Sequence, residues 1–288
     1  MAGRPSAGEA IAPTRVVEPA NFPRAVQLGV GGVLIALAIL AWKITGDRMR
    51  GMDAGPGTDL GALGWFTGVW VVMMAAMMVP STVPTILMDW RIRSGQRERG
   101  AAVAALGTTL FIGGYLVSWT AAGLVGYALL EAVRSLDIAF LSWEHGGRFV
   151  AASVLLAAAL YELTRFKDAC LSECRDPLAF LPQSWRSGAF AALRMGLAHG
   201  ASCIGCCGAL MAALFALGVM SIGWMALIAV LITAEKLLPW KTVATRGAVT
   251  VLLTLAIAVA VSPENVPGLT LPGRAGPMQA GDGMQDDP

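Results

Sequence analysis

The stretch RMGLAHGASCIGCCGALM, from Arg194 to Met211, holds three of the five cysteines and one of the two histidines in the chain. Residues four apart share one face of an α-helix, so a helix here would present an imidazole, two thiols and a thioether along one stripe. These residues are His199, Cys203, Cys207 and Met211. Cys206 lies beside Cys203. Since neighbours on a helix are about 100° apart, we expect at most one of Cys206 and Cys207 to join that stripe.

The side chains of this stretch are typical of a site for a soft metal ion. Thiolate and thioether sulfur prefer Cu(I) or Zn(II), imidazole suits either metal, and Mg(II) or Ca(II) would require oxygen ligands. The sequence therefore predicts a transition-metal site, with Cu(I) as the expected ion and zinc as the alternative. A structural interpretation competes with this one, because cysteine packs as a small hydrophobe and glycines let helices approach closely in lipid. The glycines concerned are Gly196, Gly200, Gly205 and Gly208.

The composition indicates an integral membrane protein. Of the 288 residues, 56% are hydrophobic and 14% are charged, whereas a soluble domain is roughly 25% charged. A net charge of +2, with no basic run interleaved with aromatics, argues against nucleic acid as a partner. The first 24 residues lack an apolar core followed by a small-residue cleavage site. We therefore expect residues 1–24 to form a disordered cytoplasmic arm and not a signal peptide.

Seven apolar runs approach or exceed the roughly 20 residues that cross a bilayer. They cover residues 25–44, 64–87, 102–130, 148–163, 188–220, 222–238 and 247–262. We expect an all-α, polytopic transmembrane helix bundle of about seven spans (six to seven) over residues 25–262, followed by a disordered tail at 263–288. The run 188–220 is too long for one straight span. Either it bends within 200–208, or an interfacial helix leads into a shorter span.

The basic residues predict the orientation, because cytoplasmic loops of membrane proteins carry the excess of Lys and Arg. With seven spans and a cytoplasmic N-terminus, 15 of the 21 basic residues fall inside and 6 fall outside. This distribution favours a cytoplasmic N-terminus in a multi-pass membrane protein. In this orientation the candidate ligands of four different spans all lie in the cytoplasmic half of the bilayer.

The second apolar run adds a cluster of thioethers. Its methionines fall in two pairs that are each one helical turn apart: Met73 with Met77 and Met74 with Met78. Two prolines follow, Pro80 and Pro84, which free backbone carbonyls that other groups must satisfy inside a membrane. Methionine commonly fills gaps in a core. Beside a copper site, however, Met74, Met77 and Met78 are candidate ligands.

A second cysteine pair follows the fourth apolar run, in the segment YELTRFKDACLSECRDP from Tyr161 to Pro177. Cys170 and Cys174 are four residues apart and share one face of any helix that continues to Arg175. This pair could bind Cu(I) through two thiolates, or it could be a pair of reduced cytosolic thiols with no function.

Two glutamates lie inside apolar runs, where an ionisable group is costly and therefore a functional candidate by default. Glu235 lies within the sixth run, near its cytoplasmic end, either as a ligand or as half of a Glu235-Lys236 pair that snorkels to the interface. Glu162, at the inner end of the fourth run, presents the same choice. We expect His145 and Glu144 to form a solvated pair in an outer loop.

These residues fall in sequence blocks that can be compared with known patterns. The blocks are M-x-x-A-M-M-x-P-S at Met73–Ser81, C-L-x-x-C-R-x-P at Cys170–Pro177, H-G-x-x-C-x-G-C-C at His199–Cys207, A-L-M at 209–211, G-V-M at 218–220 and E-K at 235–236. Over roughly residues 65–238 the chain resembles a bacterial family, a domain of unknown function described as predicted metal-binding integral membrane proteins, with some members labelled copper chaperones. The resemblance implies metal binding in a membrane.

The chain departs from the family pattern at three places. It has Ala201 and Ser202 where the family tends to have an aromatic residue, and Gly208 where the family tends to have tryptophan. It also has Thr164-Arg165-Phe166-Lys167 in place of T-P-L-K. No candidate ligand is lost, so the departures concern only the fine geometry of the site.

Two functions of different classes stay open. The first is Cu(I) handling, by delivery or export, without enzymatic activity; its partners would be membrane lipid and a soluble or periplasmic metal-receiving protein, and glycine-rich helices make a homo-oligomer feasible. The second is a membrane thiol-disulfide oxidoreductase in which Cys170 and Cys174 exchange electrons with the Cys203 group, although Cys170 and Cys174 lack the usual C-x-x-C spacing. Haem binding is disfavoured because the two histidines, His145 and His199, are predicted on opposite sides.

Overall fold

The computed structural model describes residues 24–49, 62–94, 101–135, 146–176, 189–219, 221–266 and 269. Within these residues the chain is all-α, with eight α-helices, one short 3₁₀ helix and no strand. The helices are α1 (Arg24–Met49), α2 (Leu63–Ser94), α3 (Ala101–Ser135), α4 (Arg148–Glu162), α5 (Arg165–Arg175), α7 (Ala189–Leu217), α8 (Ile222–Leu237), α9 (Lys241–Val261) and η3 (Pro263–Asn265). The predicted arm before residue 24, the Glu144-His145 pair and most of the predicted tail lie outside the described residues.

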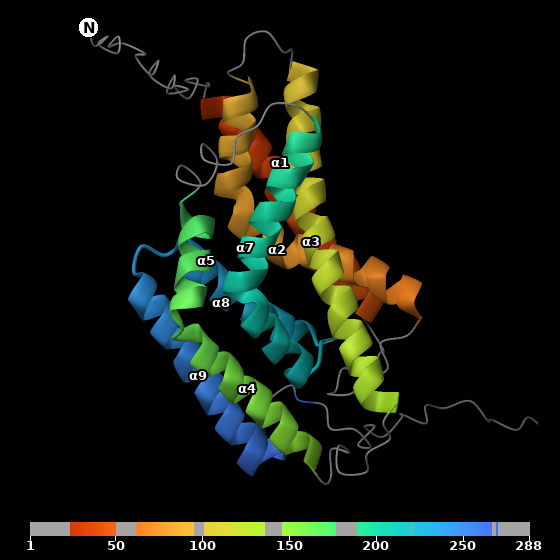
Figure 1. Cartoon of the computed structure of the whole chain (residues 1–288), viewed down its shortest axis with the longest axis vertical. Helices are drawn as coiled ribbons and strands as arrows, with labels where there is room; N and C mark the ends of the chain where they lie inside the picture. The colour runs from red at the N-terminus through yellow and green to blue at the C-terminus, as the bar shows by residue number, and fades with distance from the viewer. Residues whose placement is uncertain are drawn as a thin grey trace, which may run out of the picture.

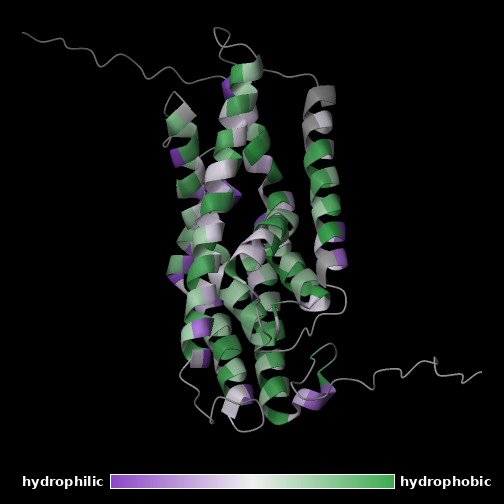
Figure 2. Cartoon of the chain, turned by 90° about the vertical axis from the view of Figure 1, so that its right-hand side faces the viewer, coloured by the Kyte–Doolittle hydropathy of each residue, from purple (hydrophilic) through white to green (hydrophobic). Residues whose placement is uncertain are grey.

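Several helices are long and apolar enough to cross a membrane. Four pass this criterion alone, namely α2, α3, α7 and α9, and α4 with α5 would make a fifth as a pair bent by 67°. Figure 2 shows apolar residues along most of the helical surface. These findings confirm the all-α class and are compatible with a membrane location. The seven spans and the cytoplasmic N-terminus stay predictions, and α8, at 16 residues, is shorter than a typical span.

Helices α3 and α7 pack along each other, and small residues make their close approach feasible. A Cβ atom at Gly196 would overlap the carbonyl oxygen of Phe111 on α3, and one at Gly114 would overlap the carbonyl oxygen of Leu193 on α7. Elsewhere α1 packs on α2 and α4 packs on α9, as Figure 1 shows. Gly196, in the cysteine-rich stretch Arg194–Met211, therefore has a packing role.

Helix α2 continues through both of its prolines, and a side-chain donor binds the carbonyl that Pro80 leaves without its usual partner. Pro80 cannot donate to the carbonyl oxygen of Ala76, and the indole N–H of Trp42 on α1 donates to that oxygen instead, at 3.1 Å. The Ser81 and Thr82 hydroxyls donate to the Met78 carbonyl oxygen at 2.8 and 3.2 Å. The expectation that other groups would satisfy freed carbonyls is confirmed at Ala76.

The predicted span 188–220 is one helix, α7, over Ala189–Leu217. Of the two predicted alternatives, an interfacial helix joined to a separate shorter span is therefore wrong. Figure 1 shows α7 as a continuous ribbon that changes direction along its length. Gly218 follows its end with a φ of 113°, a left-handed conformation that costs glycine little.

The predicted fourth span ends in a sharp bend. Helix α4 stops at Glu162, and α5 restarts after Leu163 and Thr164 at an angle of 67°. Thr164 caps α5, because its side-chain oxygen accepts a hydrogen bond from the backbone N–H of Lys167 at 3.3 Å. The bend lays α5 against α7. The predicted helix over Cys170 and Cys174 is therefore present as α5, but its direction differs from that of α4.

The structure describes residues 263–266 and 269 at the start of the predicted tail. Pro263–Asn265 forms the 3₁₀ helix, and the side chains of Val266 and Leu269 are buried in the hydrophobic core. Apolar side chains close to the end of α9 explain this packing, since burial removes them from water.

Replacing Gly196 with alanine is expected to push α3 and α7 apart and to destabilise the fold by about 1–3 kcal/mol. Gly208→Ala is the matched control, because its new Cβ would meet Ile204 at an ordinary 3.7 Å. The control should be neutral or slightly stabilising, since alanine favours helices over glycine. Thermal unfolding of the detergent-solubilised chain, followed by circular dichroism, measures both. Equal melting temperatures for the two variants would contradict the packing described.

Candidate metal centre

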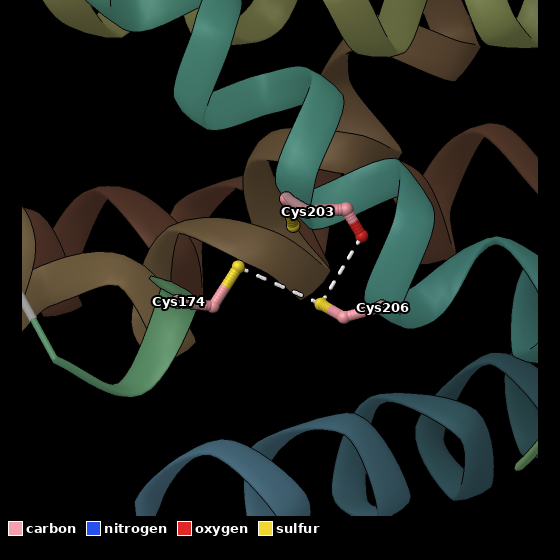
Figure 3. Close-up of side chains that lie close together, drawn as sticks. All are labelled: Cys174, Cys203 and Cys206. Atoms are coloured by element: carbon pink, nitrogen blue, oxygen red, sulfur yellow. Dashed lines mark hydrogen bonds between the residues drawn. The ribbon is translucent and has the colours of Figure 1, made fainter. Parts of the chain in front are cut away.

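Three cysteine sulfurs from two helices come together in the core. The Sγ atoms of Cys174, on α5, and of Cys203 and Cys206, on α7, all lie within 4.8 Å of one another, and all three side chains are buried. Figure 3 shows the Cys174 and Cys206 side chains pointing toward each other across the gap between α5 and α7. Their Sγ atoms are 3.6 Å apart. The sequence placed these cysteines in separate motifs, and the 67° bend before α5 brings them together.

The adjacent Cys206 and Cys207 have different positions relative to this group. The Cys206 thiol lies 3.2 Å from the Cys203 carbonyl oxygen, one turn earlier on α7, and belongs to the group. The Cys207 Sγ atom lies 3.1 Å from the Cys206 Sγ atom and is buried, but it lies outside the group of three. The two adjacent sulfurs nevertheless approach each other closely, so Cys207 lies next to the group of three.

Cys170 lies at the edge of the cluster. Its side chain is half-buried, and its sulfur rests against Gly205 of α7, where a Cβ atom would collide with it. The Tyr161 hydroxyl donates to the Gly205 carbonyl oxygen at 2.5 Å and so ties the end of α4 to the same point. Cys170 therefore lies one helical turn from Cys174 and is more accessible than the three grouped cysteines.

The sulfur of Cys203 lies within hydrogen-bonding distance of two polar groups from other helices. The Tyr115 hydroxyl, on α3, is 3.0 Å from it, and the Lys236 ammonium, on α8, is 3.1 Å from it. Lys236 also donates to the Ser81 hydroxyl oxygen on α2 at 3.3 Å. Lys236 is 5% exposed. The alternative in which Lys236 snorkels to the interface is therefore wrong, because its ammonium points inward to sulfur.

His199 and the methionines occupy the surrounding core. His199 is buried one turn before Cys203, with its ring centroid 5.8 Å from those of Phe111 and Tyr115. It lies outside the group of three cysteines. The methionines predicted as ligands are buried in the same hydrophobic cluster as the grouped cysteines. They are Met74, Met77, Met78 and Met211.

Glu235 lies in a different cluster, which is ionic. The Lys167 ammonium contacts the carboxylates of both Glu162 and Glu235, and all three side chains are almost fully buried. Arg175 donates to the backbone carbonyl oxygens of Glu235 and Leu238, the latter at 2.5 Å. Glu235 thus pairs with Lys167 and not with its neighbour Lys236. These contacts join α4, α5 and α8 beside the cysteines.

Sequence reasoning missed three residues of this region. Tyr115 lies in an apolar run and belongs to none of the sequence motifs described above. Lys167 was visible as a basic residue five positions after Glu162, but a straight helix would not have brought the two together. Lys236 was noted only as a partner of Glu235. The position of Lys236 inside an apolar run could have indicated that its charge is buried.

The donor set of the group, which is sulfur alone, suits a soft metal ion. Thiolate sulfur suits both Cu(I) and Zn(II), but structural zinc sites take four ligands in a tetrahedron. Among the residues that the structure describes, the cysteine group offers three sulfurs. A fourth donor would have to come from the neighbouring Cys207 or His199.

Replacing Lys167 with methionine is expected to destabilise the fold by about 3–5 kcal/mol, because it leaves two buried carboxylates without their cation. Lys43→Met is the control: Lys43 forms an exposed pair with Asp47 at 3.2 Å, and such pairs contribute about 0–1 kcal/mol. The melting temperature should fall markedly in the first variant and hardly in the second. A Lys167→Met protein as stable as the control would show that the ionic cluster is dispensable.

No curated protein and no solved structure matches the chain. The model of one protein family, PpoB2, described as copper chaperone, matches residues 67–259. This range includes α5, α7 and α8, and with them every residue of the cysteine group. The chain belongs to this family of copper chaperones.

Proposed function

We propose that this chain is a multi-pass protein of the bacterial inner membrane that binds Cu(I) as cargo between Cys174, Cys203 and Cys206. The observation that carries the proposal is the group of three buried sulfurs within 4.8 Å of one another. Thiolates are the ligands that Cu(I) prefers, and the family description supports copper. Binding and transfer of an ion need no catalytic group, so we propose no enzymatic activity.

The surrounding core supports a site for copper in its reduced state. Thioethers, like thiolates, are soft ligands, and the methionine cluster of α2 belongs to the same buried cluster as the cysteines. Cys207 and His199 are neighbours that could complete the coordination, whereas Glu235 is occupied by Lys167. Burial excludes water and bulky oxidants from the thiols. The site therefore suits an ion that must stay reduced.

Cys170 offers a route for the ion. It is half-buried and one turn from Cys174 on α5, so an ion could pass from an accessible sulfur to buried ones by exchange of one thiolate ligand for another. With the predicted cytoplasmic N-terminus, this route would open toward the cytoplasm. The protein that receives the ion from this chain would be a soluble or periplasmic metal-receiving protein.

The test is the copper content of the full chain, purified anaerobically in detergent from cells grown with copper. The wild-type chain should carry copper, and a variant with Cys174→Ser, Cys203→Ser and Cys206→Ser should lose it, because hydroxyl oxygen is a poor ligand for Cu(I). Elemental mass spectrometry measures the copper-to-protein ratio. Lys43→Met, which changes an exposed residue of α1, is the control and should keep its copper. Zinc in place of copper, or undiminished copper in the triple variant, would contradict the proposal.

A membrane thiol-disulfide oxidoreductase is the second candidate, and the 3.6 Å between the Cys174 and Cys206 sulfurs favours it. In such an enzyme these two thiols would lose two electrons and two protons to an oxidant and form a disulfide. All five cysteines are free in the structure. We expect the copper-free protein in intact cells to keep its thiols reduced under mild oxidant, as counted by alkylation and mass spectrometry. A reversible Cys174–Cys206 disulfide under those conditions would favour the oxidoreductase.

A further inference from the structure

Lys236 is a cation buried against the sulfur group. Its side chain is 5% exposed and its ammonium lies 3.1 Å from the Cys203 sulfur and 3.3 Å from the Ser81 hydroxyl oxygen. Tyr115 of α3 and Lys236 of α8 both contact the Cys203 sulfur of α7, and Ser81 of α2 joins them through its contact with Lys236. A lone ammonium is costly to bury, so such a position requires a negative partner.

The proposed cargo complex supplies that negative charge. Cu(I) carries one positive charge, so a complex with two thiolates has a net charge of −1 and a complex with three has −2. In a core of low dielectric such a complex is stable only if a nearby cation offsets it. The other buried lysine of this region, Lys167, already faces the two carboxylates of Glu162 and Glu235. Lys236 faces sulfur instead.

We propose that Lys236 is the fixed counter-charge of the copper–thiolate complex, held in place by Ser81 and assisted by the Tyr115 hydroxyl. This inference rests on the proposed function and adds a positioning residue to it. An ammonium has no lone pair, so Lys236 is not a ligand; it acts through Cys203. A Cu(I) complex with two thiolates, of charge −1, would be offset in full by Lys236, and one with three thiolates, of charge −2, would be offset by half.

The substitutions separate charge from shape. Methionine matches lysine in length and flexibility but carries no charge, so Lys236→Met keeps the packing and removes the cation. Arginine is bulkier and always charged, so Lys236→Arg keeps the cation and strains the packing. Tyr115→Phe removes an uncharged hydrogen-bond donor from the same sulfur. Lys43→Met removes an exposed lysine from α1 and is the control for net charge.

The experiment is an anaerobic Cu(I) competition titration of the full chain in detergent against a chromophoric Cu(I) chelator. Wild type and Lys43→Met should bind with equal affinity. Lys236→Met should bind Cu(I) about 10- to 100-fold more weakly, the usual effect of losing a residue that supports a metal ligand. Lys236→Arg should stay closer to wild type than Lys236→Met does, and Tyr115→Phe should lose less affinity than Lys236→Met.

The outcomes distinguish this inference from the proposed function. A wild-type chain that binds no Cu(I) would overturn both. Wild-type affinity in a folded Lys236→Met variant, with its melting temperature unchanged, would overturn the role of Lys236 alone. Equal losses in Lys236→Arg and Lys236→Met would assign the effect to packing and would also overturn it. Affinity retained in Lys236→Arg but lost in Lys236→Met supports the counter-charge even if both variants are less stable.

Discussion

The contact between α5 and α7 is the constraint on which the candidate site depends. One cysteine of the group lies on the short helix and two lie on the long one, so the group exists only where the two helices touch. The 67° bend after α4, capped by Thr164, turns α5 onto α7. Without the bend, α5 would continue along α4, and the two cysteine motifs of the sequence would remain apart.

Burial of charge shapes the same region. Two ammonium groups lie in the core near the cysteines, and each has a different kind of partner: Lys167 contacts two carboxylates and Lys236 contacts a thiol sulfur. Groups of this kind are expensive inside an apolar bundle and persist where they are paired. Glu235 and Lys236 are adjacent in sequence, yet their side chains leave α8 in different directions and enter separate clusters. The C-terminal end of α8 therefore contributes one residue to the ionic cluster and one to the surroundings of the cysteine group.

Much of this arrangement could be predicted from the sequence, and what could not has a physical cause. The apolar runs predicted the all-α class and most helices, and the spacing of four residues correctly placed Cys170 and Cys174 on one short helix. The sequence also identified the cysteine-rich stretch of α7. It could not show that Cys206 and not Cys207 joins Cys174, because that choice depends on how α7 is rotated against α5. The partners of Lys236 and Lys167 likewise depend on tertiary packing, which local periodicity does not contain.

The small size of α5 has a consequence for how an ion could leave. This helix has 11 residues and contributes one of the three sulfurs, whereas the other two are fixed on a helix of 29 residues. A slight rotation of α5 would reduce the coordination from three sulfurs to two and loosen the ion's hold without displacing any long helix. Lys167, which lies on α5 and joins it to α4 and α8, opposes that rotation. In the proposed Cu(I) complex, the ionic cluster would thus slow the release of the ion by holding α5 in place.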